Sequence, residues 1–202
     1  MTKSVTRGAP KIVSCATKRG RVRPREGGYG PGVGPLAYEC PMTPPLPPSP
    51  RELLLSLCDE WVGRSKIWFD PAQAPFAEFT TRGRIRKMGE GNFVAHEYEE
   101  AFDGKQHRSL AIYAFNDESQ QFESSWVHSF HMSSSIMFAT GGLTPAGFYV
   151  QGSYGDGKGG PRWGWRTEHE LRAPDQLVIT AYNIEPGGEP QKAVETVYGR
   201  RR

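Results

Sequence analysis

The chain has 202 residues, of which 37% are hydrophobic and 11% aromatic, which is enough for one globular core. Its formal charge of +3 is unevenly distributed, because residues 1–41 hold eight basic and two acidic side chains while the rest of the chain has a net charge of −3. The composition therefore does not indicate nucleic-acid binding by the main part of the chain. No run of 18 apolar residues is present, which excludes a typical membrane-spanning helix and a membrane partner.

The N-terminal segment differs in composition from everything that follows. Residues 1–48 are rich in Gly, Pro and Arg and show neither strand nor helix periodicity, so we expect a disordered basic tail. Met42 is an alternative start codon, and in that case the preceding residues come from a mis-called gene start and are not part of the protein. A tail that binds nucleic acid is the less favoured reading, because short solvated charge runs usually bind nothing specific. The segment lacks the apolar core of a secretory signal, so a cytoplasmic protein is expected.

The folded domain is expected over residues 49–202, beginning with a helix. Ser49-Pro50-Arg51-Glu52 combines an N-cap serine, a proline at the first helical position and a glutamate at the third. Apolar residues then recur at steps of three and four as far as Trp61. The pattern predicts one short amphipathic helix over residues 50–60.

From Trp61 onward the apolar period changes to two, which is typical of strands. Turn-forming dipeptides such as Asp103-Gly104 and Gly141-Gly142 separate the segments. Ten strands are predicted, over residues 61–69, 76–87, 92–102, 107–115, 120–130, 134–140, 147–154, 161–172, 176–184 and 191–199. Short loops leave no room for crossover helices, so the sheet is antiparallel, and closing it removes two exposed edges. The predicted fold is all-β, an antiparallel meander closed into a barrel.

Four segments carry a resemblance to a known family. They are LCDEWVG at 57–63, GNFVAHEY at 91–98, WVHSF at 126–130 and ETVYGR at 195–200. In this order and spacing they resemble a bacterial family of domains of unknown function with a lipocalin-like, calycin-type barrel. Members commonly carry Asp at the position of His128, where this chain departs from them. The resemblance implies a fold and a cavity, but no catalytic residues.

The resemblance also implies one packing interaction. Lipocalin-like barrels often close one end with a tryptophan of the first strand beneath an arginine from the end of the barrel. Trp61 and Arg200 are the residues at those positions here. We therefore expect a cation–π contact between them.

The apolar parity of each strand predicts which side chains line the cavity. The candidate ligand-binding residues are His96, Tyr98, Trp126, His128, Phe130, Tyr154, Trp163, Trp165, His169 and Tyr198. Among them, His96, His128 and His169 come from three different strands. Three convergent imidazoles could bind zinc or ligate haem iron, yet buried histidines are more often core residues. No motif requires a cofactor, and none is predicted.

His128 and His131, three residues apart in the sequence, are a further candidate for a shared metal or catalytic site. Residues three apart in a strand point to opposite faces, so these two histidines share a site only if the chain bends between them. The continuous strand expected over 120–130 argues against such a pair.

Three functions remain open at this level. The favoured hypothesis is a binding module that encloses a small hydrophobic or aromatic ligand. The second is an enzyme or a haem- or metal-binding protein that uses the barrel histidines. The third is a filled barrel that serves as a scaffold or forms a homodimer.

Overall fold

The computed structural model describes residues 48–131, 134–155 and 159–201. The disordered tail expected over residues 1–48 lies, apart from its last residue, outside this described part. The described chain contains one helix, α1 (Pro50–Ser56), and eleven strands. The strands are β1 (Asp59–Ile67), β2 (Ala77–Met88), β3 (Phe93–Phe102), β4 (Lys105–Asn116), β5 (Gln121–His128), β6 (Met137–Gly141), β7 (Leu143–Thr144), β8 (Gly147–Tyr154), β9 (Trp163–Ala173), β10 (Gln176–Ile184) and β11 (Pro190–Arg200).

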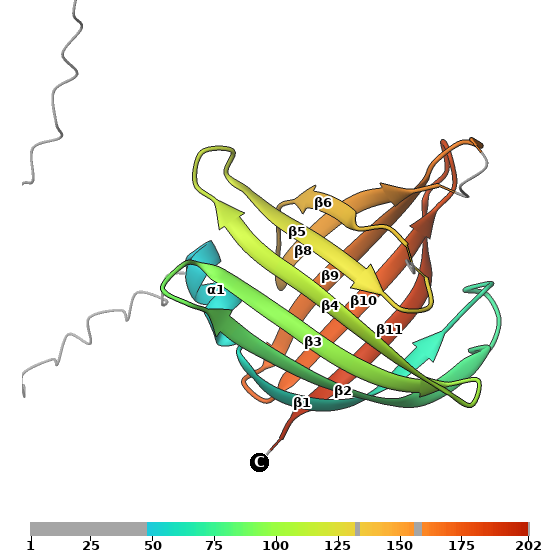
Figure 1. Ribbon diagram of the computed structural model, residues 1–202, viewed down its shortest axis with the longest axis horizontal. Helices are drawn as coiled ribbons and strands as arrows, with labels where there is room; N and C mark the ends of the chain where they lie inside the picture. The colour runs from blue at the N-terminus through green and yellow to red at the C-terminus, as the bar shows by residue number, and fades with distance from the viewer. Residues whose placement is uncertain (1–47, 132–133, 156–158, 202) are drawn as a thin grey trace, which may run out of the picture. The chain divides into compact units, whose positions relative to one another are not determined.

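The strands form one closed antiparallel barrel, which confirms the predicted fold class. Their order is β6-β5-β4-β3-β2-β1-β11-β10-β9-β8-β7, and an additional pairing of β6 with β8 closes the ring (Figure 1). Ten strands make up the ring, and the two-residue β7 pairs only with β8 at the closing seam. The chain thus meanders around the barrel, with β1 and β11 joined side by side.

Helix α1 lies at one end of the barrel and the β1–β2 connection lies at the other (Figure 1). The predicted capping box is present: the Ser49 hydroxyl accepts from the Glu52 amide, and the Glu52 carboxylate accepts from the Ser49 amide. The helix ends at Ser56, four residues earlier than predicted, because β1 begins at Asp59 and pairs with β2. Leu53, Leu54 and Leu57 are buried against the barrel interior.

The predicted contact between Trp61 and Arg200 is also confirmed. The guanidinium carbon of Arg200 lies 4.7 Å from the centroid of the Trp61 ring. Trp61 is buried and donates its indole N–H to the Leu57 carbonyl at 2.9 Å. Together these contacts anchor the end of α1 to the first and last strands of the barrel.

Two glycines allow the strands to approach closely at the seam between β6 and β8. Only Ala139–Gly152 and Thr140–Gln151 are paired there. A Cβ atom on Gly152 would lie 2.6 Å from the Phe138 carbonyl oxygen, and one on Gly141 would clash with the Tyr149 carbonyl oxygen. Gly141 was expected to belong to a turn, but it is the last residue of β6 and packs against β8.

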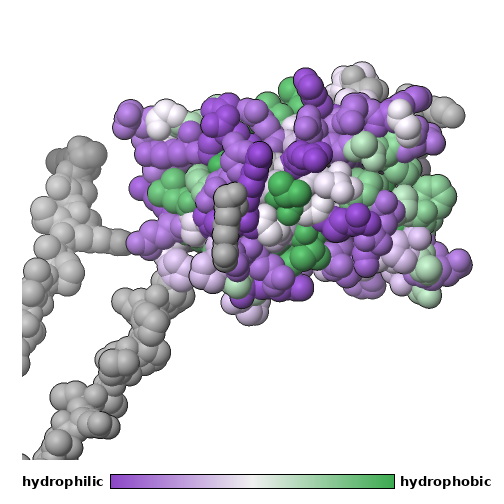
Figure 2. Space-filling model, turned by 90° about the horizontal axis from the view of Figure 1, so that it is seen from below, coloured by the Kyte–Doolittle hydropathy of each residue, from purple (hydrophilic) through white to green (hydrophobic). Residues whose placement is uncertain are grey.

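The interior is filled near α1 and hollow toward the opposite end. The main core cluster combines the leucines of α1 with Trp61, Phe122 and Phe148. At the opposite end, Phe69, Phe76 and Phe130 are exposed. Figure 2 shows a largely hydrophilic outer wall, with hydrophobic surface gathered at the right-hand end as well as near the centre of the view. Within the described ranges, no helix is both long and apolar enough to cross a membrane.

Candidate functional site

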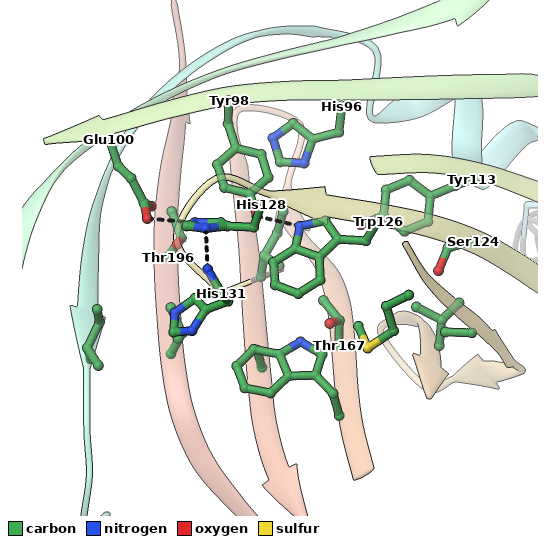
Figure 3. A pocket seen from close by; sticks show the side chains of 18 of the residues that line it. His96, Tyr98, Glu100, Tyr113, Ser124, Trp126, His128, His131, Thr167 and Thr196 are labelled. Carbon is green, nitrogen blue, oxygen red and sulfur yellow. Dashed lines mark hydrogen bonds and ion pairs between the residues drawn. The ribbon is translucent and has the colours of Figure 1, made fainter. Parts of the chain in front are cut away.

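A cavity of about 90 Å³ lies in the hollow half of the barrel. Most of its wall is apolar or aromatic, and its polar groups come mainly from β3 and the end of β5 (Figure 3). The lining residues are Ile67, Phe79, His96, Tyr98, Glu100, Tyr113, Ser124, Trp126, His128, His131, Met137, Ala139, Val150, Trp165, Thr167, Ile179, Ala181, Val194, Thr196 and Tyr198. An apolar enclosure with a few placed polar groups is typical of small-molecule sites.

A second pocket of about 160 Å³ adjoins this cavity on the side of the β1–β2 connection. The two share five lining residues, which are Ile67, Trp126, His131, Trp165 and Val194. The second pocket is also lined by Phe69, one of the exposed aromatic residues at the open end. The second pocket therefore connects the inner cavity with the hydrophobic rim.

Trp126 and Trp165 form the aromatic wall between the two pockets. Their rings are nearly parallel, with an interplanar angle of 7° and a centroid separation of 6.0 Å. They come from β5 and β9, which β6 and β8 separate in the ring of strands. Parallel aromatic faces at this spacing offer π-surface to an aromatic or cationic group.

His128 and Glu100 form the most polar part of the wall. His128 Nε2 lies 3.0 Å from Glu100 Oε1, and the side chains are 4% and 14% exposed. His128 Nδ1 accepts hydrogen bonds from the main-chain amides of Phe130 at 3.0 Å and His131 at 3.2 Å. Because amide nitrogens only donate, Nδ1 carries a lone pair and the ring proton resides on Nε2.

These two hydrogen bonds also correct the expectation that His128 and His131 point to opposite faces. Strand β5 ends at His128, and the chain turns as the next amides fold back onto its ring. The two imidazole centroids lie 5.1 Å apart, and both side chains line the cavity. The alternation of a strand was thus the wrong rule here, because a side-chain-to-main-chain turn replaces the strand after residue 128. Burial lowers the pKa of His131, with the nearby Glu100 carboxylate opposing the shift.

Tyr98 links β3 to the tryptophan wall. Its hydroxyl oxygen accepts a 2.9 Å hydrogen bond from Trp126 Nε1 (Figure 3). Burial raises the pKa of Tyr98 to about 12, so the hydroxyl keeps its proton at neutral pH. A Tyr98 O–H that accepts from Trp126 still has its own proton to donate, and its side chain lines the cavity.

His96 and His169 are buried deeper in the barrel. Desolvation lowers the pKa of each to about 3, so both are neutral at pH 7. His96 Nε2 and both ring nitrogens of His169 lack hydrogen-bond partners among the described residues. His169 stacks on Phe148 with a centroid separation of 4.5 Å and meets the Tyr113 ring at 4.8 Å. It packs as an aromatic core residue.

The three inward histidines are not brought together as a ligand set. His96 and His128 line the cavity, whereas His169 lies within the packed layer of Phe148 and Tyr113. Across residues 48–131, 134–155 and 159–201, no group of three or more His, Cys, Asp or Glu side chains has a metal-binding arrangement. These residues therefore do not assemble the zinc site considered from the sequence.

The candidate ligand-binding residues fall into three groups. His96, Tyr98, Trp126, His128, Trp165 and Tyr198 line the inner cavity. Tyr154 lines the adjoining pocket, where its hydroxyl donates to Asn183 Oδ1 at 2.5 Å. Phe130, Trp163 and His169 line neither pocket: Phe130 follows the end of β5 and is exposed, and Trp163 stands at the start of β9.

Among the polar residues that line the cavity, Glu100 and His131 were not identified from the sequence. Glu100 has the same parity as His96 and Tyr98 on β3, so strand alternation was a sufficient signal for it. His131 reaches the cavity only because the chain turns after His128, a feature that no periodicity shows.

The comparisons with known proteins concern the fold and the family. The described barrel is similar to the crystal structure of Rv2717c from M. tuberculosis, with a TM-score of 0.53 and 17% sequence identity over 76% of this chain and 98% of that one. At this identity the likeness shows the fold alone. No curated protein matches the chain. A family model described as a protein of unknown function, DUF1579, matches residues 46–200, which is most of the chain. The chain therefore belongs to the DUF1579 family.

Proposed function

We propose that this protein binds a small, largely apolar or aromatic ligand inside its barrel. The observation that carries the proposal is the pair of adjoining pockets, about 90 and 160 Å³, that share the parallel tryptophans Trp126 and Trp165. An apolar cavity of roughly 150 Å³ is known to accept a molecule as large as benzene. The two pockets together thus suit a single-ring ligand.

The polar groups of the wall support a binding role over a purely structural one. A core that served only stability would be expected to fill this space with aliphatic side chains, because each void removes dispersion contacts. Here Tyr98 and Glu100 from β3, and His131 from the turn after β5, line the void instead. Such groups orient a ligand that the apolar wall holds.

The proposal is tested by titrating the protein with toluene and benzyl alcohol. Binding at the Trp126–Trp165 wall is expected to change tryptophan fluorescence and to raise Tm, because a ligand that binds only the folded state stabilises it. Ala181 lines the cavity, so Ala181→Leu should weaken binding of both probes by removing space.

Ala101→Leu is the matched control, because Ala101 is exposed on β3 and lines neither pocket. Circular dichroism verifies that both variants fold. If neither probe changes the fluorescence or Tm of the wild type, or if Ala101→Leu weakens binding as much as Ala181→Leu, the barrel does not use this cavity for binding.

A further inference from the structure

The cavity contains one carboxylate and no cationic side chain. Glu100 is the single Asp or Glu among the residues that line it, and no Lys or Arg lines it. Within the described ranges, no Lys or Arg pairs with Glu100, and its close polar partner is the His128 ring, 3.0 Å away. By contrast Glu97, three residues earlier and on the outer face of the same strand, is paired with Arg86 at 2.7 Å.

His128 does not neutralise Glu100. A positively charged imidazole needs protons on both ring nitrogens, but His128 Nδ1 accepts from two main-chain amides. His128 therefore donates one hydrogen bond from a neutral ring and brings no positive charge to the Glu100 carboxylate (Figure 3). His131, the other histidine of this cluster, is biased toward its neutral form by burial.

A carboxylate buried among aromatic side chains, with one hydrogen bond from a neutral ring, costs folding free energy unless a cation binds beside it. The Glu100 side chain is 14% exposed, so most of its hydration is lost on folding. Burying an ionised group without a counter-charge costs free energy that a bound cation would offset. His128 engages Oε1, and Glu100 also lines the cavity, so a donor can approach the carboxylate from inside.

The aromatic residues next to Glu100 complete the environment of a cation. Tyr98 lies on the same strand and the same face as Glu100. Trp126 donates a hydrogen bond to the Tyr98 hydroxyl. Ring faces attract ammonium groups, most strongly where water is excluded. Phe79, Ile179 and Val194 add apolar surface to the wall.

From this arrangement we infer that the ligand is a small amine that carries an ammonium group on an apolar or aromatic body. The ammonium pairs with the Glu100 carboxylate, and the body lies against Trp126 and Trp165. The inference rests on the proposed function and adds the charge of the ligand to it.

Three probes of nearly equal shape test the charge: benzylamine, benzyl alcohol and benzoate. Binding is measured by isothermal titration calorimetry at low ionic strength, in phosphate buffer at about pH 8. At this pH, histidines with an ordinary pKa of about 6.5 are neutral, and benzylamine is largely protonated. Benzylamine is expected to bind at least tenfold more tightly than benzyl alcohol, and benzoate more weakly than either. Added salt should narrow these differences.

Glu100→Gln identifies the group responsible. The glutamine carbonyl can still accept from His128 Nε2, so the variant removes the charge while keeping this hydrogen bond. It should lower benzylamine affinity at least tenfold and leave benzyl alcohol within about twofold of the wild type. Glu99→Gln, on the exposed face of the same strand, is the control and should change neither affinity.

The outcomes separate the two proposals. If benzyl alcohol binds and benzylamine binds no more tightly, or if Glu100→Gln leaves the preference intact, the inference about the amine is wrong while the cavity remains a binding site. If none of the three probes binds, the proposed function fails and the inference fails with it.

Discussion

The Arg200 guanidinium covers the Trp61 ring at 4.7 Å and also joins α1 to the barrel. Its Nη1 donates to Asp59 Oδ2 at 2.6 Å, and its Nη2 donates to the Ser56 carbonyl at 3.0 Å. One side chain thus connects the last strand, the first strand and the end of the helix. Cation–π packing and charge-assisted hydrogen bonds act together at this position.

Arg200→Ala is expected to lower the free energy of unfolding by about 2 kcal/mol, because both kinds of contact are lost. Arg200→Lys should lose less, since it keeps the charge but not the planar fork. Urea denaturation measures both. Arg64→Ala is the control, because the exposed Arg64–Glu78 pair should contribute less than about 1 kcal/mol. Equal losses in all three variants would contradict the anchoring role of Arg200.

Gly152→Ala is expected to destabilise the barrel at its seam. The added methyl would meet the Phe138 carbonyl oxygen at 2.6 Å, and main-chain atoms cannot move aside without breaking the β6–β8 pairing. Overpacking of this kind costs about 1–3 kcal/mol. Gly199→Ala provides the comparison, because its nearest neighbour is 3.8 Å away. Urea denaturation that shows the same loss at both glycines would exclude a special role for the seam.

The stability of the protein should fall as the pH drops below about 6.5, the ordinary histidine value. His96 and His169 have pKa values lowered to about 3 by desolvation, so in that range the unfolded chain binds protons that the folded chain does not. Each buried histidine is expected to contribute a slope of roughly 1.4 kcal/mol per pH unit between about pH 6 and 3. Stability above this window is unaffected by either residue's titration.

His169→Phe should reduce this slope by about half. Phenylalanine preserves the ring contacts with Phe148 and Tyr113 and removes two ring nitrogens that lack partners among the described residues. Stability at pH 7 is therefore expected to be unchanged or higher, because unpaired buried polar atoms cost about 1–3 kcal/mol. Urea denaturation repeated from pH 7 to pH 4 gives the slopes. An unaltered slope in the variant would show that His169 does not titrate as its burial implies.

Tyr98→Phe is expected to cost about 1 kcal/mol, because the Trp126 indole N–H loses its acceptor. A double-mutant cycle with Trp126→Phe isolates the interaction, since the second substitution should cost less once the first is present. Tyr182→Phe is the control, because its hydroxyl lies 3.4 Å from Glu168 in a more exposed position. Strict additivity of the Tyr98 and Trp126 variants would show that their hydrogen bond contributes nothing.

Several features of the fold follow from local sequence alone. The capping box at Ser49 and Glu52 and the period-two pattern after Trp61 depend on neighbours within a few residues, so they predict elements correctly. Closure into a barrel follows from the number of strands and the short connections between them. The Trp61–Arg200 contact came instead through family resemblance, because it joins residues from opposite ends of the domain.

The candidate site depended on information that strand parity lacks. Parity separates inward from outward side chains, but it does not give their height along the barrel axis. His96, His128 and His169 all point inward, yet only the first two reach the cavity, because strand register and the docking of α1 decide which part of the interior is filled. Strand parity was enough to place Glu100 on the inward face. That its partner His128 is a neutral ring follows only from the hydrogen bonds that His128 makes.

The helix start, the strands and the closed antiparallel barrel were predictable from the amino-acid sequence, because these depend on short-range propensity and alternation. Three features became visible with the folded barrel: the chain turns after His128 and brings His131 beside it, Gly152 lies at the seam, and the cavity has one carboxylate in its wall. Those features arise where strands distant in sequence pack together, and packing over such distances is set by the whole barrel.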